Sequence, residues 1–119
     1  MITQYEVPAI IRSEIPSLSN VNHYGRATLE TFESVHDLTD YTRHSVEDHD
    51  HNIARKCFAL AEKLYKEGDR VVKIMIENIF IYSFSSLMPA DKTERLFIKS
   101  AIPDSLYSIY LKQVNSISC

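Results

Sequence analysis

The sequence predicts an all-α protein of five to six helices, stacked as antiparallel αα-hairpins in a HEAT-like or irregular bundle. Its 119 residues are 45% hydrophobic and 24% charged, which are ordinary values for a globular domain. Only two Gly and four Pro are present, which leaves little material for the tight turns of a β-sandwich. Apolar residues recur at intervals of three and four along most of the chain. The length fits one domain, residues 1–119, and is too short for two independent ones.

Two helices are predicted in the first part of the chain. The first covers 7–15, because Pro8 suits a first helical position and Pro16 ends the pattern. A polar loop follows. The second helix covers 27–46, where the apolar stripe consists of Phe32, Val35, Thr39, Thr42 and Val46.

The third and fourth predicted helices meet at Gly68-Asp69. The third, 53–67, has a core-facing stripe made of Ile53, Cys57, Leu60, Ala61 and Leu64. We expect Gly68 to close it in the left-handed conformation. Asp69 should then accept hydrogen bonds from the free N–H groups that open the next helix. The result is an αα-hairpin with almost no loop.

The fourth helix, 70–87, is apolar on nearly every side, so we expect neighbours to cover it from several directions. Its segment 79–82 is also compatible with a buried strand, because β-branched and aromatic residues favour one. The helix is favoured because helical spacing continues on both sides. The apolar stretch is shorter than the roughly 20 residues that a membrane span needs, so no membrane association is predicted.

Two shorter helices complete the prediction. Asp91 and Glu94 have the spacing of a capping box, which indicates a fifth helix that runs to about Ala101. Pro103 then precedes a last amphipathic helix with a stripe of Leu106, Ile109, Tyr110 and Val114. Five tyrosines fall in or near apolar stripes, and we expect them at the edges of the core: Tyr5, Tyr65, Tyr82, Tyr107 and Tyr110.

The charge of the chain is unevenly distributed. The net charge is −3, but residues 30–50 hold seven acidic residues and one basic residue, Arg43. This local balance of −6 leaves +3 on the remainder of the chain. The asymmetry favours binding to a cationic partner.

The acidic residues of this segment follow a helical repeat. Those at 33, 37, 40 and 47, with His44, form one stripe on the second predicted helix. We define the acidic ridge as Glu33, Asp37, Asp40, Glu47, Asp48 and Asp50. Tyr41 flanks it, and Tyr beside charge is a common composition of binding patches. We predict that the ridge and Tyr41 bind a partner protein; a solvated helix face is the alternative.

Catalytic patterns are weak in this sequence. Glu33 and His36 form one Glu-x-x-His, whereas a di-iron bundle needs two, and the run 48–51 is explained by a polar turn. Cys57 lies on a core stripe, where burial raises the pKa of a thiol. No Gly-rich phosphate loop or Gly-x-Ser-x-Gly occurs. We therefore predict no enzyme, no metal and no cofactor.

Other partners and the location follow from the same patterns. Nucleic acid is not a predicted partner, because the basic residues are scattered and an acidic ridge repels phosphates. The N-terminus lacks a basic start followed by an apolar run, so it does not resemble a signal peptide. Two cysteines without metal-type spacing fit a reducing compartment. We expect a cytoplasmic protein, and its oligomeric state is not predicted.

The stretch 35–87 also carries a resemblance. Its features are His36-Asp37-Leu38-Thr39-Asp40-Tyr41, Cys57-Phe58-Ala59 and Gly68-Asp69-x-x-Val72, followed by Ile102-Pro103-Asp104-Ser105-Leu106. They resemble a family of small uncharacterised bacterial all-α proteins that look like immunity proteins of polymorphic or contact-dependent toxin systems. The resemblance implies a cytoplasmic protein that binds and blocks a cognate toxin domain, frequently a nuclease.

Three functional hypotheses follow. The first is an immunity or inhibitor protein whose acidic ridge covers the basic site of a toxin. The second is a helical scaffold or adaptor in a regulatory assembly. The third, a metal-dependent enzyme that uses the His and Asp residues of 48–51, is the least favoured.

Overall fold

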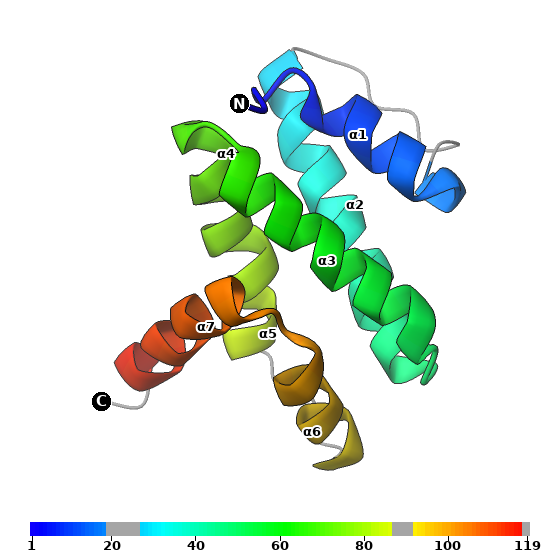
Figure 1. Ribbon diagram of the computed structural model, residues 1–119, viewed down its shortest axis with the longest axis vertical. Coiled ribbons are helices and arrows are strands. Elements are labelled where there is room, and N and C mark those ends of the chain that lie inside the picture. Colours follow the sequence, from blue (N-terminus) through cyan, green and yellow to red (C-terminus); the bar gives the residue numbers. More distant parts are fainter. Residues whose placement is uncertain (19–26, 87–91, 118–119) are drawn as a thin grey trace.

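The computed structural model describes residues 1–18, 27–86 and 92–117 and confirms the all-α class (Figure 1). The elements in chain order are α1 (Val7–Glu14), the 3₁₀ turn η1 (Pro16–Leu18), α2 (Ala27–Glu47), α3 (His51–Glu67), α4 (Arg70–Met75), the π-helical segment η2 (Ile76–Ile81), α5 (Tyr82–Ser86), α6 (Lys92–Ala101) and α7 (Asp104–Ile117). Each of the six predicted helices is found within a few residues of its expected bounds. The expected capping box lies outside the described part of the chain, which does not include Asp91 or the side chain of Glu94.

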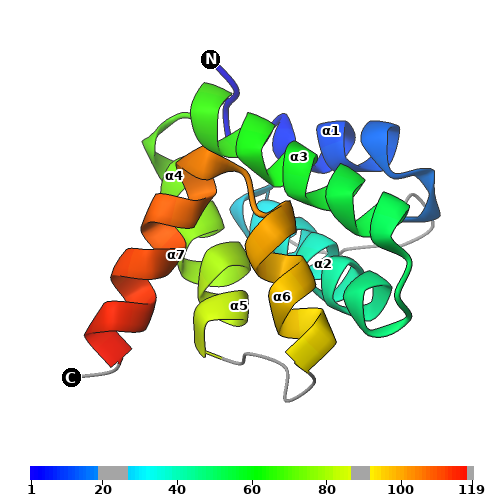
Figure 2. The same ribbon diagram turned by 60° about the horizontal axis from the view of Figure 1, so that its bottom comes forward.

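The helices pack in an irregular arrangement (Figures 1 and 2). α1 and α3 both pack on α2, and α6 contacts α2 and α3. α4, η2 and α5 form one continuous helical run, which packs on α2 and α3 and also on α7. α3 and this run diverge from their shared turn in Figure 1. The finer prediction of stacked antiparallel hairpins is not confirmed.

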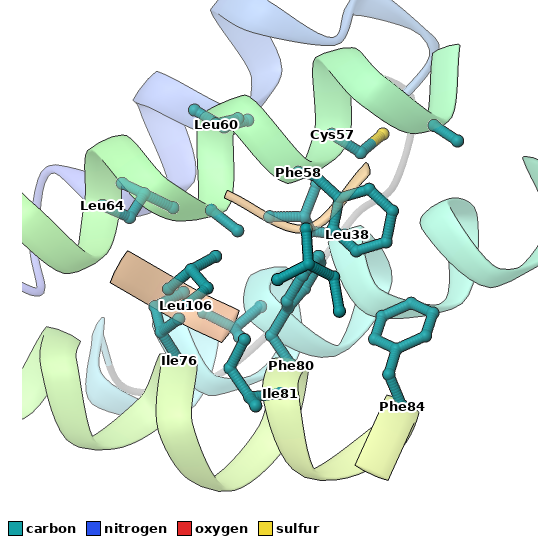
Figure 3. Close-up of a cluster of buried hydrophobic side chains, with 14 of the residues drawn as sticks. Leu38, Cys57, Phe58, Leu60, Leu64, Ile76, Phe80, Ile81, Phe84 and Leu106 are labelled. Atoms are coloured by element: carbon teal, nitrogen blue, oxygen red, sulfur yellow. The ribbon is translucent and has the colours of Figure 1, made fainter. Parts of the chain in front are cut away.

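One hydrophobic core joins all the α-helices. At its centre the rings of Phe58, Phe80 and Phe84 contact one another, with centroids 5.7 Å apart for Phe58–Phe80 and 5.3 Å for the other two pairs (Figure 3). Such aromatic pairs contribute roughly 0.5–1.5 kcal/mol each beyond the area that they bury. The triangle therefore fixes α3 against the run formed by η2 and α5.

The turn between α3 and α4 differs from the prediction at Gly68. Its φ is −75° and its ψ 157°, so the left-handed closure was wrong and the backbone is extended. Glycine is needed there for space. A Cβ at this position would lie 2.3 Å from the carbonyl oxygen of Leu64 and 2.5 Å from Cγ1 of Val72. The predicted N-cap is confirmed, because Asp69 accepts a hydrogen bond from the backbone N–H of Val72 at 3.0 Å.

The extended backbone at Gly68 pairs with the N-terminal segment. Ile2 donates its N–H to the carbonyl of Glu67 at 2.6 Å and accepts from the N–H of Asp69 at 2.8 Å, which makes an isolated parallel bridge. The Ile2 side chain is buried in the core. This long-range contact holds the start of the chain on the α3–α4 turn.

The left-handed residue of the fold is His49, at the end of α2. Its φ is 59°, and among the described non-glycine residues it alone has a positive φ. Its N–H donates to the carbonyl of Val46, and the N–H of Asp50 donates to that of Ser45, which is the Schellman pattern of hydrogen bonds. Asp50 then caps α3 by accepting from the N–H of Ile53 at 3.4 Å.

The run 70–86 is helical throughout, so the strand alternative for 79–82 was wrong. In η2 the helix widens to the π form, whose bonds join residues five apart; the N–H of Tyr82 donates to the carbonyl of Glu77. Both Phe80 and Ile81 are fully buried in this wider turn. The expected cover from several directions is found, because α2, α3 and α7 all pack on this run, but Ile74 remains 45% and Tyr82 51% exposed.

Two further expectations about the core need correction. Phe32 was placed on the apolar stripe of α2 but is 43% exposed, with its ring against that of His36 at 4.6 Å. Tyr5 was expected at a core edge but is 64% exposed, whereas Tyr110 is buried as predicted. Periodicity places a residue on a face of a helix, but the width of the covered face depends on the neighbouring helices.

We predict that Gly68→Ala destabilises the protein by about 3 kcal/mol, because the added methyl overlaps a backbone oxygen that cannot move without disturbing α3. Urea denaturation followed by circular dichroism measures the loss. A change below about 0.5 kcal/mol would contradict the proposed lack of space, since substitutions at positions without such a feature usually stay within that range.

The opposite sign is expected at His49. His49→Gly removes the steric cost of a left-handed non-glycine residue, which is about 1 kcal/mol. The entropy that glycine loses on folding offsets part of this gain. The free energy of unfolding should therefore stay equal or rise slightly in the same assay. A loss of more than about 1 kcal/mol would show that the imidazole itself stabilises the turn.

Candidate functional site

The acidic ridge lies along α2 and the turn that follows it. Four of its residues, Asp40, Glu47, Asp48 and Asp50, are exposed, and Glu33 and Asp37 are half-buried. The stripe is continuous because a 21-residue helix carries residues 33 to 47 without a break. The structure therefore brings the predicted acidic side chains onto one helix and its C-terminal turn.

Three of these carboxylates are without a partner. Within the described part of the chain, the side chains of Asp40, Glu47 and Asp48 make no hydrogen bond or ion pair. Acids outside the ridge are engaged in several places: Glu30 pairs with Arg12, Glu14 with Lys63 at 3.6 Å and Glu62 with Lys66 at 3.7 Å. Within the described residues, the negative charge of Asp40, Glu47 and Asp48 is therefore not neutralised by a paired cation.

Arg43, the single basic residue of the −6 segment, is directed toward α5. Its Nη1 donates to the hydroxyl of Ser83 at 3.4 Å. This interaction joins α2 to α5 on the side of α2 that faces the π-helical run. Arg43 is held there by a hydroxyl and not by a ridge carboxylate.

Two of the predicted partner-binding residues have structural contacts. Asp50 caps α3, and Tyr41 is half-buried against the core with its hydroxyl 3.4 Å from that of Ser17. These contacts account for the position of both side chains. The exposed part of the predicted surface is consequently centred on Asp40, Glu47 and Asp48.

The histidines of 48–51 serve the turn and its packing. His51 stacks on Phe97 of α6 with ring centroids 4.0 Å apart, and His49 adopts the left-handed conformation. Across residues 1–18, 27–86 and 92–117, no three His, Cys, Asp or Glu side chains are grouped so that they could hold a metal ion. The metal-dependent hypothesis gains no candidate site in these residues.

Cys57 is fully buried on α3. Burial raises the pKa of its thiol, and a hydrogen bond with Thr42 and the charge of Lys56 oppose this only in part. A raised pKa leaves less thiolate at neutral pH, so the group is a poor nucleophile. The predicted core role of this residue is confirmed.

Two hollows that sequence reasoning missed flank Tyr82. The first, which we call the α2 cavity, has a volume of about 270 Å³ and lies between α2 and the π-helical run. It is lined mainly by His36, Asp40, Arg43, Asn78, Ile79 and Tyr82. The second, the α7 cavity, measures about 570 Å³ and is lined mainly by Tyr65, Glu77, Tyr82, Ile109, Lys112 and Gln113. The one signal in the sequence was the excess of apolar residues around the helix 70–87.

The polar groups of the α7 cavity are held by one another. Tyr65 donates its hydroxyl to the carboxylate of Glu77 at 3.1 Å, and the side chain of Gln113 donates to the Glu77 carbonyl at 2.9 Å. Burial, with the hydrogen bond and charge of Glu77, raises the pKa of Tyr65, so its phenol stays protonated as a donor. These bonds tie α3 and α7 to the π-helical turn.

Fold and site together define an all-α protein with an acidic helix surface, on which Asp40, Glu47 and Asp48 are unpaired among the described residues, and with two hollows at the helical run 70–86. Residues 8–116 match the family described as domain of unknown function DUF7674, and the chain belongs to that family. This description names no activity and does not connect the family with immunity proteins. No curated protein and no solved structure matches the chain. Among the described helices, none is both long and apolar enough to cross a membrane.

We predict that Cys57 is unreactive in the folded protein. In a Cys119→Ser variant, Ellman's reagent should label the thiol of Cys57 in the native protein only as fast as the protein unfolds. In urea, where the protein is unfolded, the labelling rate should equal that of an exposed thiol. The reason is burial together with the raised pKa. Rapid labelling of the native protein at neutral pH would contradict the assignment of Cys57 to the core.

Proposed function

We propose that this protein is an immunity or inhibitor protein, which binds and neutralises a cognate toxin domain of the nuclease class through the acidic ridge. The toxin class comes from the resemblance of the sequence and from the sign of the charge. A nuclease must present cationic groups to the phosphates of its substrate, and an acidic surface is complementary to such a site.

The observation that carries the proposal is that Asp40, Glu47 and Asp48 have no internal partner among the residues that the structure describes. Exposed carboxylates that are unpaired can meet the cations of another protein without first breaking an ion pair of their own. Their mutual repulsion in the free protein is also relieved when a cationic surface covers them. A field of one sign accelerates association by roughly ten- to a thousand-fold, which suits an inhibitor that must bind before its target acts.

A scaffold or adaptor protein is the second candidate. It is favoured by exposed apolar side chains away from the ridge, including Leu96 on α6 and Leu111 on α7. Apolar residues scattered singly over a surface are common in monomeric proteins, however. The concentration of unpaired charge at one place therefore favours the inhibitor.

We predict that the protein forms a complex with the product of the gene adjacent to its own and protects cells from it. The variant Glu47→Gln/Asp48→Asn should weaken this complex at least tenfold in calorimetry, because two interfacial charges are lost. The affinity of the wild-type complex should fall steeply with added salt.

A matched control is Glu6→Gln/Glu67→Gln, which removes the same charge from exposed positions outside the ridge. It should leave the affinity within about twofold, since charges beyond a Debye length are largely screened. Absence of a complex in size exclusion and of protection from growth arrest would exclude the proposed function. Equal weakening by both double variants would exclude the ridge as the interface.

A further inference from the structure

Tyr82 occupies an unusual place in the fold. It is the first residue of α5, directly after the π-helical turn, and it lines both the α2 cavity and the α7 cavity. Its side chain is half exposed although it lies in the most apolar helical run of the chain. Aromatic residues with this combination of exposure and adjoining hollows are enriched among the residues that dominate protein interfaces.

The size of the α2 cavity limits what can enter it. Small-molecule sites usually measure about 300–1,000 Å³, and this cavity is just below that range at about 270 Å³. It is large enough for one aromatic or large aliphatic side chain. Interfaces place their strongest anchors in pockets of this kind.

The rim of the cavity is partly apolar. Ile79 contributes a half-buried wall, and the exposed ring of Phe32 packs against His36, which lines the cavity. Ile74 and Tyr82 on the helical run are also exposed. An apolar anchor in the cavity would therefore pack on Ile79 and the ring of Tyr82, and the remaining lining residues are polar.

The charge at the cavity identifies the kind of partner. Asp40 lines the cavity and is also an unpaired residue of the acidic ridge. Arg43 also lines the cavity; its Nη1 donates to the hydroxyl of Ser83 at 3.4 Å, and it keeps its positive charge. Residues 30–50 still carry a balance of −6, so a basic side chain placed on Asp40 would be attracted by the acidic ridge, whereas an acidic one would meet the repulsion of the ridge.

We propose that the α2 cavity docks a basic segment of the partner protein, which inserts one large apolar side chain beside Tyr82 and places a cationic side chain on Asp40. This inference rests on the proposed function, because it takes the partner to be cationic. It extends the interface from the acidic ridge to the α2 cavity, which lies between α2 and the run 70–86. In this arrangement the α2 cavity receives the apolar side chain of the partner, and the acidic ridge attracts the cationic surface around it.

The first test of this docking site uses the protein without its partner and two nearly isosteric probes, tryptamine and indole-3-propionate. Both carry an indole as the anchor, and they differ in the sign of the charge on a short tether. Titrations into the ¹⁵N-labelled full chain are followed by amide shifts. Tryptamine should shift Thr39, Asp40, Ile79 and Tyr82 and bind at least threefold more tightly than indole-3-propionate. Asp40→Asn should abolish this preference.

Three outcomes would overturn the inference at this stage. They are equal binding of the two probes, shifts confined to Ser108 and Ile109 around the α7 cavity, and no shift at millimolar probe. A loss of the wild-type spectrum in Asp40→Asn would point to misfolding, so the same comparison is repeated on the wild-type chain in about 1 M salt, where the Debye length is only about 3 Å and exposed charges are largely screened. The preference for tryptamine should fall there as well.

The second stage uses the complex with the adjacent gene product. Tyr82→Ala should weaken it at least tenfold, whereas the control Tyr5→Ala, which removes a ring that is 64% exposed on the N-terminal segment, should not change it. If the ridge variant weakens the complex but Tyr82→Ala does not, the partner does not dock in the α2 cavity, and the proposed function stands. If no complex forms, the proposed function fails, and the probe titrations report on the α2 cavity alone. A monomer–dimer equilibrium that Tyr82→Ala abolishes would make this surface a self-interface and overturn the inference.

Discussion

The close approach of two helices at residue 68 is the constraint on which the rest of the fold depends. Because Gly68 has no side chain, Val72 of the first turn of α4 packs directly against its backbone, and only two residues, Gly68 and Asp69, separate α3 from α4. The extended backbone that results is free to pair with Ile2. One missing Cβ thus sets the direction of the helical run 70–86 and the place of the N-terminal segment. The aromatic triangle of the core forms where this run meets α3.

The π-helical turn determines which apolar residues of that run point inward. The wider turn accommodates both Phe80 and Ile81 in the core, and Ile74 and Tyr82 are left at the surface. A helix with such an apolar composition would normally be enclosed by neighbours. Here α2 and α7 cover two sides incompletely, and the cavities on either side of Tyr82 are the gaps that remain. The structural irregularity and the proposed docking site therefore have a common origin.

Local signals in the sequence predicted local structure well. Helical periodicity located the six helices, and the capping role of Asp69 follows from its side chain and its place before an apolar helix. Contacts between distant segments were not predictable in this way. The space at Gly68 is taken by Val72 through the angle of the turn, and the exposure of Phe32 depends on how far η2 covers α2. The acidic stripe was visible in the sequence, but the lack of ion pairs at Asp40 was not, since cations from any other helix could have reached it.

The bridge between Ile2 and Gly68 has a consequence for how the chain is made. Synthesis proceeds from the N-terminus, so the first residues leave the ribosome long before the segment that completes their pairing. Until residue 69 has emerged, α1 and α2 can associate with each other, but the side chain of Ile2 has no core to enter. The side chain of Ile2 therefore stays exposed in the nascent chain until the α3–α4 turn has been made, and during that time chaperones that bind apolar side chains have access to it.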